Sequence, residues 1–410
     1  MRDYEVLYAG GVTPYFVLVG GFSGVIAWLA GGSAAAITIS VIAVEVSTAL
    51  CWVVFASYTR NIWQMPRVII TLVFALVRAT FAYVLRGCKP VFPEWTFKFE
   101  LARAGARALR SGPLAPNVTQ PRNARYSNLT MKTLGMRSGP KICQQHGTKM
   151  EIIEFNGMEH VWIRESAPAA DDLSHKERFV VLYYHGGGFV LYSPHFFVDL
   201  ANRVRTAIMK IIHEDYPNMT NVSVECFLAN YRKAPDFPYP VPQEDALAAF
   251  EHIVEAENLD PSRIAKGLGQ PGGAILSCPF VDFQVEEQAD DSLCVLPLEL
   301  GQAMMDAFLP TRKDPTTWGD AAPVYSDLSG LPPALIQVGS VDTIYLSAIK
   351  LYEKAVADGL GGTWELDVFL HMPHAFTVLS EKLLPDVAKG IDHFAHFAVR
   401  MFHRVSYSSS

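Results

Sequence analysis

Three consecutive glycines follow a short apolar run in the middle of the chain. The run Arg178–Tyr184 has the length and the continuous apolar character of a strand buried on both faces of a parallel sheet. It is followed by His185, Gly186, Gly187, Gly188 and Phe189. Glycines let the backbone turn sharply and leave amide N–H groups uncovered, which suits the binding of a developing oxyanion. The alternative is a simple glycine turn after a strand.

The elements around this motif alternate between strand and helix patterns after about Gly147. Further strands are predicted at Val222–Ala229, Ala334–Val338 and Trp364–Phe369. Amphipathic helices are predicted at Gln243–Ala256 and Ser347–Asp358. This alternation predicts an α/β fold with a doubly wound, mostly parallel sheet.

Several other motifs follow the glycines in a fixed order. They are Tyr231-Arg232-Lys233-Ala234-Pro235, Phe237-Pro238-Tyr239-Pro240 with Asp245, Gly330-Leu331-Pro332-Pro333, Asp342, and His371-Met372-Pro373-His374-Ala375-Phe376. Together with the glycine loop, this set resembles the hormone-sensitive-lipase-like branch of the α/β-hydrolases, which includes arylacetamide deacetylases. The resemblance extends from about Val180 to Phe397, and His-Gly-Gly-Gly is the oxyanion-loop form of lipases and esterases.

The resemblance implies a role for each matching residue. The amides of Gly187 and Gly188 would bind the oxyanion, Asp342 would be the acid of a catalytic triad, and His374 would be its base. In that chemistry the imidazole accepts the nucleophile's proton, while the carboxylate fixes the tautomer and stabilises the imidazolium. His371 lacks the motif match, and we expect it to be structural.

The nucleophile of the family is missing from its expected place. The family's serine lies in a Gly-Asp-Ser-Ala-Gly-Gly elbow, but no Gly-x-Ser-x-Gly occurs in this chain. One alignment places Gln270 or Pro271 at the serine position. We prefer a second, in which Ala274–Phe283 is the strand that follows the elbow unit and the unit itself is absent near 265–274. Parallel neighbours need a crossover of about a dozen residues or more, and too few separate Ala265 from Ala274. Ser277 and Cys278 are alternative nucleophiles that no motif pairs with His374.

The N-terminal part of the chain predicts a membrane region. From Val6 to Thr59 the only charged residue is Glu45, and about 20 residues suffice to cross a bilayer. We predict spans at Val12–Ala30 and Ala34–Ala56, and a third candidate at Val68–Leu85. The third carries Arg78 near its middle, at a cost of about 2.5–3.5 kcal/mol on insertion scales, so the number of spans is two or three. The alternative is a signal peptide followed by a buried helical hairpin. The apolar stretch is far longer than the apolar region of a signal peptide, which argues against this alternative.

The predicted organisation is a membrane region at 1–90, a linker or lid at 91–147, and a hydrolase domain at 148–405. Glu94–Arg110 has helical spacing of apolar and basic residues, which fits a helix on the membrane, a lid or an ordinary surface helix. Basic residues flank the spans on both sides and leave the orientation open. Asn117, Asn128, Asn218 and Asn221 begin glycosylation sequons, which fits a luminal domain and the endoplasmic reticulum membrane.

Composition excludes several classes of protein. The net charge of −7 gives no basic excess for nucleic acid, and an apolar fraction of 50% excludes intrinsic disorder. The six cysteines contain no Cys-x-x-Cys pair, so neither a zinc ribbon nor a dense disulfide scaffold is expected, and no cofactor or metal is predicted. A single disulfide is compatible with the sequence.

Two functions fit these observations. The first is a membrane-bound carboxylic ester hydrolase acting on apolar esters, lipids or acyl-amides, impaired by the missing serine. The second is a catalytically inactive product of splicing or gene modelling, or a pseudoenzyme that binds lipid or a protein partner. A transporter is disfavoured because two or three spans form a small part of the chain.

Overall fold

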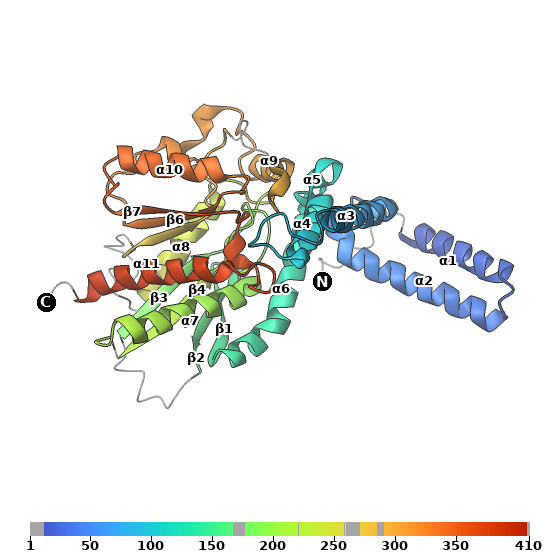
Figure 1. The fold of residues 1–410 in the computed structure, drawn as a ribbon, viewed down its shortest axis with the longest axis horizontal. Helices are drawn as coiled ribbons and strands as arrows, with labels where there is room; N and C mark the ends of the chain where they lie inside the picture. Colours follow the sequence, from blue (N-terminus) through green and yellow to red (C-terminus); the bar gives the residue numbers. More distant parts are fainter. Residues whose placement is uncertain are drawn as a thin grey trace.

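The fold is given by a computed structural model that describes residues 12–166, 177–219, 221–257, 259, 271–284 and 291–407. An N-terminal set of helices precedes an α/β body. These helices are α1 (Val12–Leu29), α2 (Ala34–Phe55), α3 (Met65–Leu85), α4 (Phe97–Arg110), α5 (Ala115–Val118) and α6 (Pro121–Gln145). In Figure 1 the hairpin of α1 and α2 projects from one end of the molecule, and the α/β body forms the other end.

The first two helices form a hairpin because the chain can reverse at Gly31, which has a φ of 76°. Ser33 caps α2 by accepting a hydrogen bond from the amide of Ala36. The helices pack closely at Gly20, where an added Cβ would lie 2.4 Å from a carboxylate oxygen of Glu45. The one charged side chain of the first two predicted spans therefore packs against α1.

The third helix leaves a row of apolar side chains uncovered. Ile70, Phe74, Val77 and Phe81 are each more than 60% exposed. Among the described helices, Ile62–Leu85 is long and apolar enough to cross a membrane by length and composition, and Val17–Leu29 and Ala34–Thr48 are shorter apolar helices. Within the described residues, the candidate that carries Arg78 thus meets both criteria.

The basic side chains of α4 bind the α/β body. Arg103 donates to the carbonyl of Ser292 at 2.6 Å, and Arg107 donates to the carbonyl of Cys294 at 3.0 Å. Thr96 caps the helix by accepting from the amide of Phe99. These two guanidinium groups are used within the protein, which disfavours a position of α4 on the membrane surface.

Two of the glycosylation sequons are tied into the fold. The Asn117 side chain is buried and donates to the carbonyl of Tyr58 at 3.0 Å. The Asn128 amide donates to the carbonyl of Val190 at 3.0 Å. Both amide nitrogens therefore serve as donors inside the fold, which disfavours glycans at these two positions.

The first sheet contains four strands in the order β1-β2-β4-β3: β1 (Thr148–Phe155), β2 (Met158–Glu165), β3 (Glu177–Tyr184) and β4 (Val222–Ala229). Asn156 and Gly157 join β1 to β2 with positive φ at both residues, which a tight two-residue hairpin requires. β3 and β4 are parallel and are connected by α7 (Val198–Asp215). Every residue of β4 is buried, as expected for a central strand.

The second sheet contains three parallel strands in the order β5-β6-β7: β5 (Ala274–Ser277), β6 (Ala334–Gly339) and β7 (Trp364–Phe369). The remaining helices are α8 (Val241–Ala256), α9 (Leu298–Phe308), α10 (Tyr345–Ala357) and α11 (Val387–Tyr407). α10 packs on β6 and β7, whereas α8 packs on the first sheet. The predicted strand Ala274–Phe283 is too long. Cys278 has a φ of 49°, and Pro279 has no amide N–H to continue a ladder.

The described strands form two separate sheets rather than one. β3 and β5 are edge strands of separate sheets, and no strand within the described ranges pairs with either free edge. The predicted interruption near 265–274 falls largely on residues 260–270, which lie outside the described residues. Helix α11 packs against both sheets, since Phe402 stacks on Phe179 at 4.3 Å and Phe397 lies in a cluster with Leu335.

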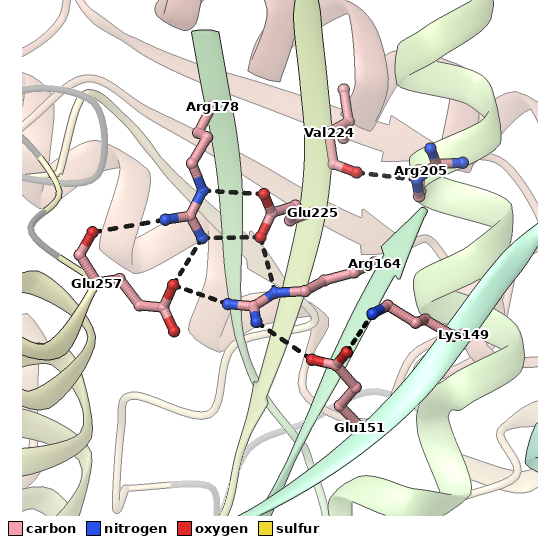
Figure 2. Close-up of polar contacts among 8 residues, drawn as sticks. All are labelled: Lys149, Glu151, Arg164, Arg178, Arg205, Val224, Glu225 and Glu257. Atoms are coloured by element: carbon pink, nitrogen blue, oxygen red, sulfur yellow. Dashed lines mark hydrogen bonds and ion pairs between the residues drawn. The ribbon is translucent and has the colours of Figure 1, made fainter. Parts of the chain in front are cut away.

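An ion-pair network holds the first sheet together at the end remote from the glycine loop. Figure 2 shows Glu225 of β4 between Arg164 of β2 and Arg178 of β3. Arg178 binds both oxygens of Glu225, at 2.9 and 2.8 Å, and Arg164 donates to Glu225 at 3.0 Å. Glu257, just after α8, contacts both arginines at 2.8 and 2.9 Å. The network therefore links three strands to a helix end.

We predict that Glu225→Gln lowers the free energy of unfolding by about 3 kcal/mol, because it removes the buried charge that pairs two arginines. Lys149→Gln is the matched control, since its pair with Glu151 is exposed and should contribute less than about 1 kcal/mol. Urea denaturation followed by circular dichroism measures both. Equal effects would show that the network contributes no more than a surface ion pair.

Candidate active site

The glycine loop at the carboxyl end of β3 has a backbone that other residues would not fit. Gly187 has a φ of 121°, and an added Cβ would lie 2.3 Å from the carbonyl oxygen of Leu191. Gly188 has a φ of 60°, and its added Cβ would lie 2.5 Å from the sulfur of Met304. In the described part of the chain, neither amide N–H donates a hydrogen bond. Both donors are thus available to an oxyanion.

His185, the first residue of the loop, is held by contacts with Tyr231. Its ring stacks on Tyr231 at 4.5 Å, and the Tyr231 hydroxyl donates to the carbonyl of His185 at 2.6 Å. Burial lowers the pKa of His185 to about 3, so its imidazole is neutral near pH 7. An added Cβ at Gly186 would meet no atom within 4 Å, so crowding does not explain that glycine. His185 therefore holds the loop through its contacts with Tyr231 rather than acting as a base.

The structure brings Asp342 and His374 together. Asp342 follows β6 and His374 follows β7, and the Nδ1 atom of His374 lies 3.1 Å from each carboxylate oxygen of Asp342. The Asp342 side chain is fully buried, and Oδ1 also accepts from the amide of Ile344 at 3.0 Å. Burial lowers the pKa of His374, but the charge of Asp342 and its hydrogen bond together outweigh burial and raise the pKa overall. Donation of Nδ1–H to Asp342 leaves Nε2 as the proton acceptor.

His371 joins the loop of His374 to the N-terminal helices. Its Nδ1 atom lies 2.9 Å from Glu94, and its ring stacks on Phe92 with centroids 3.9 Å apart. The indole of Trp95 donates to the carbonyl of His371 at 2.7 Å. The segment between α3 and α4 therefore contacts the loop that holds His374. Sequence analysis missed this contact because the two segments are far apart in the chain.

The alternative nucleophiles do not bond to His374. The Ser277 hydroxyl lies 3.4 Å from the Thr377 hydroxyl, and the Cys278 sulfur accepts from the amide of Ala375 at 3.2 Å. Burial, and then the Asp342 charge, raise the pKa of Cys278, which keeps it a thiol. Within the described ranges, no hydroxyl or thiol donates to His374.

Parallel strands that alternate with helices, a glycine loop after one strand and an acid–histidine pair after two others define an α/β-hydrolase architecture. The sequence profile of the α/β-hydrolase fold family matches residues 181–267 and 264–378. A carboxylesterase of Mycobacterium tuberculosis, NlhH, is 30% identical over 244 residues, which cover 51% of this chain and 69% of that protein. The chain therefore belongs to the α/β-hydrolase family.

Two further similarities agree with this assignment. An acetyl-hydrolase of Streptomyces hygroscopicus is 26% identical over 209 residues, which cover 45% of this chain and 64% of that protein. The chain thus spans just under two thirds of that relative. The crystal structure of an esterase from the bacterial hormone-sensitive lipase family has a TM-score of 0.56 at 22% identity, and covers 77% of this chain and 100% of that chain. At this level of identity, the similarity to the crystal structure shows a shared fold.

Proposed function

We propose that this chain is a membrane-anchored carboxylic ester hydrolase whose acyl-transfer site is impaired by the loss of its nucleophile. The contact between His374 and Asp342 is the observation that carries the proposal. In the complete mechanism, a serine hydroxyl attacks the carbonyl carbon and His374 Nε2 takes its proton. Asp342 stabilises the imidazolium, and the amides of Gly187 and Gly188 bind the oxyanion. Apolar esters or acyl-amides are the proposed substrates.

The missing nucleophile is supported by the separation of the two sheets. A strand ending in the elbow would have β3 and β5 as neighbours, and both have free edges among the described strands. The family match also divides into two segments that meet at residues 264–267. These observations equally favour the second candidate function, an inactive relative that binds lipid or a partner protein.

Membrane anchoring is proposed from the exposed apolar side chains of α3. Phe74 and Phe81 are 68% and 63% exposed. Contact of such large apolar side chains with water is unfavourable, whereas lipid accommodates them. The loop of His374 contacts the segment that directly follows this helix. An anchored enzyme would thus hold its base loop near the membrane. The endoplasmic reticulum is the proposed membrane.

We predict that the native chain does not react with a fluorophosphonate probe, because the sequence has no elbow serine and no hydroxyl among the described residues bonds to His374. Insertion of a strand end, a Gly-Asp-Ser-Ala-Gly-Gly elbow and a helix, roughly 30 residues, between Ala265 and Gly267 should restore labelling and hydrolysis of a short p-nitrophenyl ester. Both are measured on purified protein by gel fluorescence and absorbance.

The matched controls are the same insertion with alanine at the elbow serine, and the repaired chain with His374→Ala. Each should lose the restored activity. Labelling of the native chain that disappears in Ser277→Ala would overturn the missing-nucleophile proposal and identify Ser277 instead.

We also predict that the full chain stays in the membrane pellet after an alkaline carbonate wash, because α3 is apolar over enough length to span a bilayer. A chain lacking residues 12–85 should move to the supernatant. Immunoblots of both fractions measure this. Release of the intact chain would contradict anchoring.

A further inference from the structure

The second sheet brings three potential metal ligands together at one edge. Cys278 follows β5, Asp342 follows β6 and His374 follows β7. The carboxyl ends of parallel strands lie at the same edge of a sheet, so these side chains converge. One ligand atom from each residue lies within 4.8 Å of the other two.

The chemical types of these ligands select a particular class of ion. Sulfur, imidazole nitrogen and a single carboxylate together suit Zn²⁺, whereas Mg²⁺ and Ca²⁺ prefer oxygen ligands alone. Three protein ligands with one open position for water is a recurring zinc arrangement. The His374 side chain is 25% exposed while that of Asp342 is fully buried, so the open position would lie on the side of His374.

The spacing already approaches that of a metal site. Two ligands about 2.0–2.1 Å from a tetrahedral zinc ion lie about 3.3 Å apart. His374 Nδ1 is 3.1 Å from each oxygen of Asp342, so this pair needs to open by only a few tenths of an ångström. The Cys278 sulfur lies no more than 4.8 Å from the ligand atoms of the other two residues.

Neighbouring backbone groups hold the ligands in place. The amide of Ala375 donates to the Cys278 sulfur at 3.2 Å, and the amide of Ile344 donates to Asp342 Oδ1 at 3.0 Å. A second thiol, Cys294, lies 4.0 Å from Asp342 Oδ1. Within the described residues, no lysine or arginine pairs with Asp342. The neighbours of this buried carboxylate include the thiols of Cys278 and Cys294 and the imidazole of His374. Such outer contacts orient ligands in metal sites.

We propose that Cys278, Asp342 and His374 bind one Zn²⁺ ion, with water in the fourth position. On binding, the Cys278 thiol loses its proton to solvent, and the proton on His374 Nδ1 is replaced by the metal while Nε2 becomes protonated. The net change is the release of one proton. The metal then replaces the hydrogen bond between His374 and Asp342 and removes the base of the hydrolase mechanism. The site does not depend on the proposed esterase activity.

The test is a Co²⁺ titration of the detergent-purified full chain after removal of metals with a chelator. The expected result is one Co²⁺ per chain, with the visible bands of four-coordinate cobalt and a thiolate-to-cobalt charge-transfer band that Zn²⁺ abolishes. X-ray absorption of the zinc form should show one sulfur at about 2.3 Å and nitrogen or oxygen ligands at about 2.0–2.1 Å.

Variants separate this site from other thiols. Cys278→Ser should abolish the charge-transfer band, and His374→Ala should weaken Zn²⁺ binding at least about tenfold. Cys226→Ser is the matched control, because Cys226 is also a buried thiol but lies on β4. Circular dichroism checks folding, and Asp342→Asn replaces Cys278→Ser if the latter does not fold. The absence of the band in the native chain, or its persistence in Cys278→Ser, overturns the proposal.

Discussion

The backbone groups on the facing edges of β3 and β5 are the constraint on which the rest of the structure depends. A strand buried in a parallel sheet needs hydrogen-bond partners on both sides, and each unpaired buried group costs about 1–3 kcal/mol. β3 pairs with β4, and β5 pairs with β6, but no described strand lies between them. Residues 257–273 are too few for a further strand and its crossover helix, since a βαβ unit takes about 30 residues or more. The body is therefore held across this boundary by side chains, including the stack of Phe179 on Phe402 of α11.

This division also separates the parts of the site. The glycine loop ends β3 in the first sheet, whereas Asp342 and His374 follow strands of the second. In a complete hydrolase the strand bearing the nucleophile would join the two halves. Here the glycine loop touches the second half of the chain through α9, where Met304 lies against Gly188. The proposed zinc ligands all belong to the second sheet, so that site needs no alignment of the two halves.

The sequence predicts well those features that depend on local pattern. Val222–Ala229 and Trp364–Phe369 are strands with the predicted bounds. The first is a largely apolar run and the second alternates apolar and acidic residues, and both patterns are typical of strands. The predicted end of β5, Phe283, is wrong, because β5 ends at Ser277. The apolar run to Phe283 gives no sign of the left-handed backbone at Cys278. Contacts between distant segments leave no local signal. The ion pair of His371 with Glu94 and the closeness of Cys278 to Asp342 depend on how the sheet assembles.

Amide hydrogen exchange resolved to single residues tests the central claim, that a strand is missing between β3 and β5, most directly. In an edge strand, alternate amides face the missing neighbour and are protected only weakly. The account predicts fast exchange at alternate residues of Glu177–Tyr184 and of Ala274–Ser277, against slow exchange throughout the central strand Val222–Ala229. Equally slow exchange in all three strands would mean that β3 and β5 are paired, and would contradict the missing strand.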